Sequence, residues 1–142
     1  MSDRFVLDGS VTMAWFFGDE ATPAVDGLLD RLGSGARALV AQHWSLEVGN
    51  TVLMAERRKR CTAAAAAHFM GILGSLPIDT DPETGSHAMA GTLALARTYG
   101  LTSYDAAYLE LAMRTSLPLA TLDGDLRSAA KKAGVRCLPE RV

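Results

Sequence analysis

The stretch Leu101-Thr-Ser-Tyr-Asp105-Ala-Ala-Tyr-Leu-Glu110 decides how we interpret this chain. Apolar side chains follow Asp105 at i+3 and i+4, as Tyr108 and Leu109, which is the spacing of one face of an α-helix. Thr102 stands three residues before the acid, where an N-cap is expected. The pattern therefore predicts a helix with one acid in its first turn, where a carboxylate also satisfies backbone N–H groups. Taken alone, Asp105 has a purely structural explanation.

Length and composition describe an ordinary globular protein. The chain has 142 residues, of which 49% are hydrophobic and 21% are charged, and its formal net charge is −2. That charge argues against a protein that coats nucleic acid by charge alone, although a nuclease with a local basic patch remains compatible with it. We expect one domain over residues 1–142. No apolar run approaches the roughly 20 residues of a membrane span.

The compartment follows from the cysteines and from the start of the chain. Cys61 and Cys137 form no C-x-x-C pair and suggest no disulfide framework. The first residues lack the long apolar core of a signal peptide. We therefore expect a cytoplasmic protein with no membrane association.

Apolar segments with strand and helix signals alternate along the chain. We expect strands at 5–7, 38–41, 117–122 and 135–138, an extended edge segment at 76–78, and a loop at 79–85. We expect helices at 11–17, 23–32, 45–60, 62–74, 86–99, from 102 onward, and from 124 to 133. This order predicts an α/β fold with a mainly parallel central sheet flanked by helices.

Four acids stand at or near the starts of predicted helices: Asp8, Glu47, Asp105 and Asp123. In an open parallel sheet such positions gather at the carboxyl edge of the strands, where ligands bind. A cap contributes about 1 kcal/mol, so each acid alone could be a helix cap. Capping does not explain their polar neighbours, which are Ser10, Asn50, Thr121 and Asp125.

Clustered carboxylates need a counter-charge. Two unit charges about 4 Å apart repel each other by about 4 kcal/mol at an effective dielectric constant near 20. Such a cluster persists when a cation holds it. Oxygen ligands suit Mg²⁺ or Mn²⁺, whereas zinc prefers Cys and His. Hydrolysis of a phosphodiester is the chemistry that this kind of site supports.

Four motifs in series resemble those of the PIN-domain nucleases, and most closely those of VapC-type toxins. They are Val6-Leu-Asp8-Gly-Ser10, Leu46-Glu47-Val-Gly-Asn50, Leu101-Thr-Ser-Tyr-Asp105-Ala-Ala-Tyr-Leu and Ala120-Thr121-Leu-Asp123. Their order and spacing agree with the family over nearly the whole chain. The resemblance implies a three-layer α/β sandwich in which a mainly parallel sheet is flanked by helices.

The resemblance also implies a function. Proteins of this kind cleave RNA with Mg²⁺ or Mn²⁺, are inhibited by a small antitoxin protein and form homodimers. Asp8, Glu47, Asp105 and Asp123 would be the catalytic and metal-binding acids, and Thr121 matches the hydroxyl that orients them. Gly9 replaces an expected Ala, and the role of Asp125 is left open by the motif.

Several other residues have both a structural and a functional explanation. The basic cluster Arg57, Arg58, Lys59 and Arg60 could contact RNA phosphates, because it continues the helical stripe of Glu47, or could simply complement the helix dipole. Tyr104 and Tyr108 could stack on a base, although packing is the commoner role of such residues. The three histidines show no ligand spacing.

Two other functions fit the sequence less well. A phosphatase of the haloacid-dehalogenase type would need a second Asp two residues after Asp8, where this chain has Ser10. A binding module that kept the fold and lost the chemistry would not need acids at all four matched positions.

Overall fold

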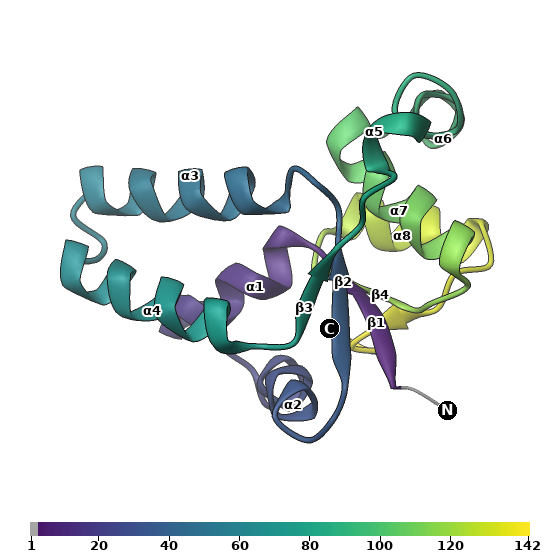
Figure 1. The fold of residues 1–142 in the computed structure, drawn as a ribbon. Coiled ribbons are helices and arrows are strands. Elements are labelled where there is room, and N and C mark those ends of the chain that lie inside the picture. The colour runs from purple at the N-terminus through teal and green to yellow at the C-terminus, as the bar shows by residue number, and fades with distance from the viewer. Residues whose placement is uncertain (1–2) are drawn as a thin grey trace.

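Five parallel strands form the centre of the molecule in our computed structural model, which describes residues 3–142 (Figure 1). They are β1 (Arg4–Leu7), β2 (Arg37–Val40), β3 (Ile78–Thr80), β4 (Leu119–Ala120) and β5 (Cys137–Leu138). Their order in the sheet is β3-β2-β1-β4-β5. Phe5, Val6 and Leu7 of the central strand are completely buried, as expected for a parallel strand covered on both faces.

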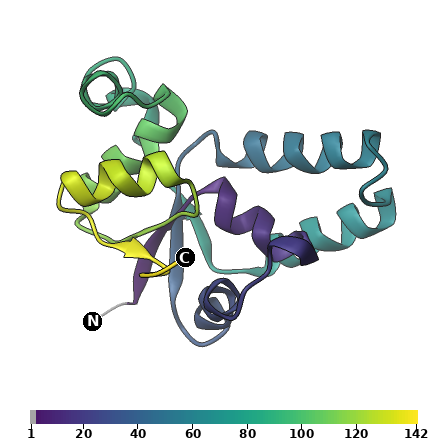
Figure 2. The same ribbon diagram turned by 180° about the vertical axis from the view of Figure 1, so that it is seen from behind.

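Helices cover both faces of this sheet. They are α1 (Gly9–Phe16), the short 3₁₀ helix η1 (Gly18–Glu20), α2 (Pro23–Leu32), α3 (Trp44–Arg57), α4 (Ala63–Ser75), α5 (Thr84–His87), α6 (Gly91–Tyr99), α7 (Ser103–Thr115) and α8 (Gly124–Lys132). Helices α1 to α4 lie on one face and α6 to α8 on the other (Figures 1 and 2). The predicted three-layer α/β sandwich is confirmed. Within residues 3–142, no helix is both long and apolar enough to cross a membrane.

The topology creates a switch point beside β1. The chain passes from β1 to β2 on one side, and later returns to pair β4 with the other side of β1. Ligand sites of open α/β sheets lie at such points, beyond the carboxyl ends of the strands. The register aligns Leu7 with Ala120, so that Asp8 and Thr121 leave the sheet at the same level.

Threonines start three of the helices as predicted. Thr22, Thr62 and Thr102 each accept a hydrogen bond from the backbone N–H three residues further on, at 3.2, 3.1 and 3.1 Å. These bonds satisfy N–H groups that have no partner inside the helix. The start of α7, which carries Asp105, is therefore fixed by its cap.

Helix α7 is more deeply buried than its sequence pattern suggests. The spacing predicts one apolar face, yet every residue from Ala106 to Ala112 is buried. The helix packs against α6, α8 and β1, so most of its circumference is covered. Burial therefore extends beyond one apolar face and includes the charged residue Glu110.

Several predicted boundaries are wrong. Helix α3 ends at Arg57 and not at residue 60, because Lys59 takes a left-handed conformation with φ 58°. The Arg60 N–H then bonds back to the Ala55 carbonyl at 2.8 Å, a common helix ending. Helix α1 begins at Gly9, two residues before the predicted start at residue 11.

The segment between α4 and α7 differs most from the sequence prediction. Residues 79–85, predicted as loop, contribute to β3 and α5. The predicted helix 86–99 is interrupted, because Ala90 has φ −125° and ψ −95°, which is not helical. Helix α6 therefore starts anew at Gly91 and packs along α7.

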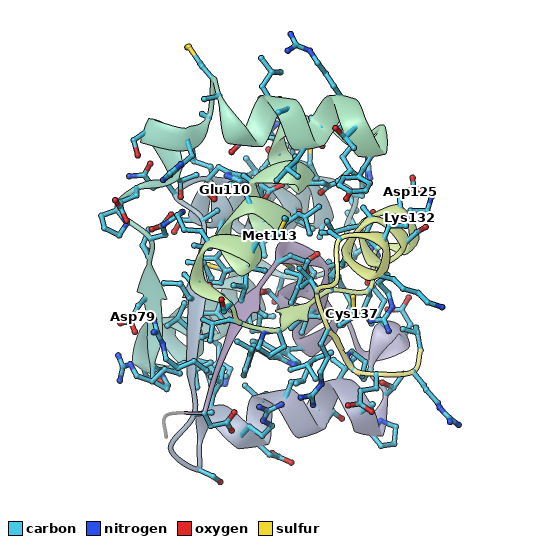
Figure 3. All side chains as sticks on the ribbon, turned by 90° about the vertical axis from the view of Figure 1, so that its right-hand side faces the viewer. Asp79, Glu110, Met113, Asp125, Lys132 and Cys137 are labelled. Atoms are coloured by element: carbon cyan, nitrogen blue, oxygen red, sulfur yellow. The ribbon has the colours of Figure 1, made fainter. Side chains whose placement is uncertain are left out.

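A charged network ties this region to α7. Arg114 donates to Asp81 at 2.7 Å, to Glu110 at 2.8 Å and to Glu83 at 3.4 Å, and His87 lies 3.6 Å from Glu110. The side chains of Asp81 and Glu110 are only 5% and 9% exposed, and Figure 3 shows Glu110 on the side of α7 that faces α6. Burial alone would raise the pKa of Asp81, but the bonds from Arg114, Glu83 N–H and Thr84 outweigh burial and lower it.

We predict that Arg114→Met lowers the free energy of unfolding by about 2–4 kcal/mol, because it leaves two buried carboxylates without their cation. Urea denaturation measures the loss. The control is Arg37→Met, which removes a surface pair with Asp79 and should cost less than about 1 kcal/mol. Equal losses in the two variants would show that the buried network is no stronger than a surface ion pair.

Candidate active site

The four predicted acids line one cleft at the switch point of the sheet. Asp8 directly follows β1 and Asp123 caps α8 after β4, while Glu47 and Asp105 lie in the first turns of α3 and α7. The cleft has a volume of about 290 Å³. Its remaining lining residues are Gly9, Ser10, Met13, Thr51 and Tyr108. Segments from four separate parts of the chain therefore bring carboxylates to one place.

Asp8 is a buried carboxylate, with only 4% of the residue exposed. Its Oδ1 accepts a hydrogen bond from the Ser10 hydroxyl at 2.7 Å and from the Val11 N–H at 3.2 Å, which caps α1. Burial raises the pKa of Asp8 to about 6, and the charge of Asp105 adds to this. The bonds from Thr121, Ser10 and Val11 N–H oppose the rise without cancelling it.

Hydroxyl groups join the end of β1 to the end of β4. The Ser10 Oγ accepts from the Leu122 N–H at 2.8 Å and lies 3.5 Å from the Thr121 Oγ1. Thr121 Oγ1 in turn accepts from the Asp123 N–H at 3.1 Å. Ser10 and Thr121 thus fix the relative positions of Asp8 and Asp123.

Glu47 has two neighbours that the sequence did not identify. The Tyr108 hydroxyl donates to Glu47 Oε1 at 2.5 Å, and His43 Nε2 lies 3.4 Å from the same oxygen. Burial raises the pKa of Tyr108 far above its ordinary value, and the bond to Glu47 raises it further. Tyr108 therefore stays a hydrogen-bond donor that orients the carboxylate. The available signals were helical spacing, because Tyr108 follows Asp105 by three residues and His43 precedes Glu47 by four.

The half-buried Asp105 reports the mutual repulsion of the acids. Its pKa is raised by burial first, and then by the negative charges of Asp123 and Glu47. Among the described residues, no Lys or Arg side chain lines the cleft to offset this repulsion.

The donor set fits a hard divalent cation. All four acids offer oxygen atoms, and the polar neighbours within the cleft, Ser10 and Thr51, offer more. Among residues 3–142, no three Asp, Glu, His or Cys side chains converge as a ready-made metal cage. Magnesium suits such an open arrangement, because it usually keeps several waters and uses one or two carboxylates plus substrate phosphate.

Two predicted neighbours of the acids lie outside the cleft. Asn50 is exposed on α3, and Thr51 lines the cleft in its place and donates to the Glu47 carbonyl at 2.9 Å. Asp125 is exposed on the surface of α8 (Figure 3). Neither residue is among those that line the cleft.

The predicted RNA-contacting cluster Arg57, Arg58, Lys59 and Arg60 lies at the far end of α3, where the chain turns into α4 (Figure 1). Ten residues of helix separate Glu47 from Arg57, which is about 15 Å at about 1.5 Å per residue. Arg60 packs its guanidinium 4.1 Å above the Phe17 ring and lies 3.5 Å from Asp19, so it is partly engaged. A role in RNA binding stays a prediction.

We predict that Asp8→Asn stabilises the protein in EDTA at neutral pH. The folded pKa of about 6 lies above the ordinary value, so the wild-type protein loses stability as pH rises from about 4 to about 6. The difference of about two pKa units corresponds to roughly 3 kcal/mol, which the variant should not lose. Thermal and urea unfolding of both proteins at pH 4 and pH 7 measures it.

Asp125→Asn, at an exposed acid near the same cleft, is the control and should follow the wild type at both pH values. Added Mg²⁺ or Mn²⁺ should raise the melting temperature of the wild type more than that of Asp8→Asn, because stabilisation follows binding. If Asp8→Asn melts no higher than the wild type in EDTA at pH 7, ionisation of the buried Asp8 does not destabilise the fold.

Solved structures from three organisms share this architecture. The structure of PAE2754 from Pyrobaculum aerophilum matches with a TM-score of 0.70 and 25% identity, over 96% of this chain and 92% of that one. Mycobacterium tuberculosis VapC20, described as a sarcin–ricin loop cleaving toxin, matches with a TM-score of 0.58 and 19% identity, over 88% and 94% of the two chains. FitAcB from Neisseria gonorrhoeae matches with a TM-score of 0.51 and 20% identity, over 96% and 97%.

The last two identities are low, so those similarities concern the fold. A comparison with proteins of curated function finds no significant match. The family model described as PIN domain, however, matches residues 5–132 of the chain. That match runs from β1 to the end of α8 and includes all four acids. The chain therefore belongs to the PIN domain family of nucleases.

Proposed function

We propose that this protein is a metal-dependent endoribonuclease that hydrolyses RNA phosphodiester bonds, and that it is the toxin of a type II toxin–antitoxin pair in the cytoplasm. The observation that carries the proposal is the cleft in which Asp8, Glu47, Asp105 and Asp123 meet, within a chain whose PIN match covers residues 5–132. The fold shared with VapC20, a toxin that cleaves the sarcin–ricin loop, supports RNA as the substrate class.

In this proposal the four acids bind the metal ion and accept a proton. Asp8 and Asp105 would be the main ligands of a Mg²⁺ or Mn²⁺ ion, and Glu47 and Asp123 would complete the site directly or through water. When bound, such an ion would supply Lewis-acid activation of water and of the scissile phosphate. One of the four acids would help to accept the proton of the attacking water.

The remaining residues of the cleft hold these carboxylates in place. Tyr108 donates its hydroxyl hydrogen to Glu47 and so limits the rotation of that side chain. Ser10 donates to Asp8, while Thr121 accepts from the backbone N–H of Asp123. Substrate affinity is assigned to the cationic segment 57–60, which an RNA strand leaving the cleft along α3 would meet.

We predict RNA cleavage that requires Mg²⁺ or Mn²⁺ and leaves 5′-phosphate and 3′-hydroxyl ends. Asp8→Asn and Glu47→Gln should each lower the rate by about 100-fold or more, since both remove a carboxylate of the reaction site. Labelled RNA incubated with each metal and with EDTA, followed by end-group analysis, measures this. Asp125→Asn should keep wild-type activity. Undiminished cleavage in EDTA after metal removal would exclude the proposed mechanism.

The partner proposed is a small antitoxin protein, bound to a homodimer of this chain. Four large apolar side chains of α3 and α4 are exposed to solvent: Leu46 is 79% exposed, and Leu53, Met70 and Ile72 are partly exposed. Exposed apolar surface of this kind suits contact with another protein.

We predict that expression of the wild-type chain arrests bacterial growth, and that co-expression of the small reading frame adjacent to its gene relieves the arrest. Asp8→Asn, expressed at the same level, should be harmless, because growth arrest would depend on cleavage. Growth curves with and without the second frame measure both effects. A wild-type chain that is harmless while it cleaves RNA in vitro would separate the nuclease from the toxin role and overturn the latter.

A phosphatase of the haloacid-dehalogenase type is not supported. The position where that class needs a second Asp is Ser10, whose hydroxyl bonds to Asp8 and to the Leu122 N–H. The PIN family match accounts for the same segment.

A further inference from the structure

Two tyrosines in the first turns of α7 have opposite environments. Tyr108 is 1% exposed and its hydroxyl is bound to Glu47, so it is a structural part of the cleft. Tyr104 is 65% exposed, and within residues 3–142 no hydrogen bond to its phenolic oxygen is found. The sequence left packing and base stacking open for both residues, and the structure buries the ring of Tyr108 but leaves most of Tyr104 exposed.

The backbone of Tyr104 is held in place although its ring is exposed. His43 Nε2–H donates to the Tyr104 carbonyl at 3.0 Å, and this bond joins the start of α3 to the start of α7. The His43 ring lies between the two tyrosines, with ring centroids 5.6 Å from Tyr104 and 5.0 Å from Tyr108. The Tyr104 ring is thus presented to solvent from a rigid support.

This ring is linked to the cleft through His43, whose ring also lies beside Tyr108, a residue of the cleft lining. Tyr104 directly precedes Asp105, whose carboxylate lines the cleft, and its neighbour His43 lies 3.4 Å from Glu47. The cleft itself contains no Lys or Arg among its lining residues. A nucleic acid that enters it meets only negative and neutral groups of the protein, so its affinity must come from other contacts nearby.

We propose that Tyr104 stacks on an RNA base adjacent to the scissile phosphate. Aromatic side chains provide such contacts for unpaired bases without reading their sequence. The ring would hold the nucleotide beside the acids, where no Lys or Arg side chain of residues 3–142 lines the cleft to do so. This inference rests on the proposed ribonuclease activity and names a contact that selects RNA with an unpaired base at the cleavage site.

The test combines a change in the protein with a change in the RNA. Steady-state cleavage is measured for wild type, Tyr104→Phe and Tyr104→Leu on a labelled single-stranded RNA that wild type cleaves, with abasic ribonucleotides placed singly on either side of the scissile bond. Loss of one stacked base corresponds to roughly 5- to 150-fold in affinity. We expect Tyr104→Leu to raise KM by a factor in this range on intact RNA, and Tyr104→Phe to behave like wild type.

The decisive result is the coupling of the two changes. One abasic position should raise the KM of wild type and leave that of Tyr104→Leu unchanged, because the base has already lost its partner. Met113→Ala, at an exposed side chain near the other end of α7, is the control and should respond to the abasic site as wild type does. If an abasic site raises the KM of wild type and of Tyr104→Leu by the same factor, the stacking contact is refuted.

A second measurement separates this inference from the proposed function. Fluorescence anisotropy of the same intact and abasic RNAs in EDTA compares binding where no cleavage is expected. Base-dependent binding that needs Tyr104, in a protein that cleaves no RNA with any metal, would retain the contact and refute the ribonuclease. If wild type and Tyr104→Leu cleave RNA with the same KM, the stacking contact is refuted but the ribonuclease activity stands. The same holds if Tyr104→Leu changes only the binding of the antitoxin.

Discussion

The burial of one carboxylate, that of Asp8, constrains the rest of the site. It stands at the end of the central strand, where the sheet is covered on both sides. Its side chain caps α1 and takes the Ser10 hydroxyl, while its carbonyl accepts from Thr12, which in turn accepts from the Trp44 indole N–H. One residue thereby organises the start of α1, the end of β4 and the entry into α3. Burying this charge lowers the stability of the fold at neutral pH, and the metal ion that we propose would offset that loss.

The arrangement of acids could largely be foreseen from local patterns. Asp8 and Asp123 follow apolar strands and cap the next helix, and Thr102 marks the helix that carries Asp105. Parallel strands leave the sheet at one edge, so three such signals already indicate one site. The fold class followed from the same alternation of strands and helices.

The contacts between elements could not be foreseen. Tyr108 and Glu47 are separated by 61 residues, and no local pattern indicates that they bond. The choice between Asn50 and Thr51 depends on the rotation of α3 about its axis, which differs by about 100° between consecutive residues. The interruption at Ala90 is likewise invisible locally, because it depends on how α6 packs along α7.

The network around Arg114 has a consequence for how this protein can change over generations. Asp81 and Glu110 come from two distant segments and share one cation, Arg114, so replacing Arg114 alone leaves two buried carboxylates without compensation. An apolar trio of similar volume could be as stable, yet any route to it that replaces Arg114 first crosses a less stable intermediate. We therefore expect these three residues to change together in related proteins. A chimaera that takes the segment around Asp81 from one relative and α7 from another would combine residues that do not neutralise one another.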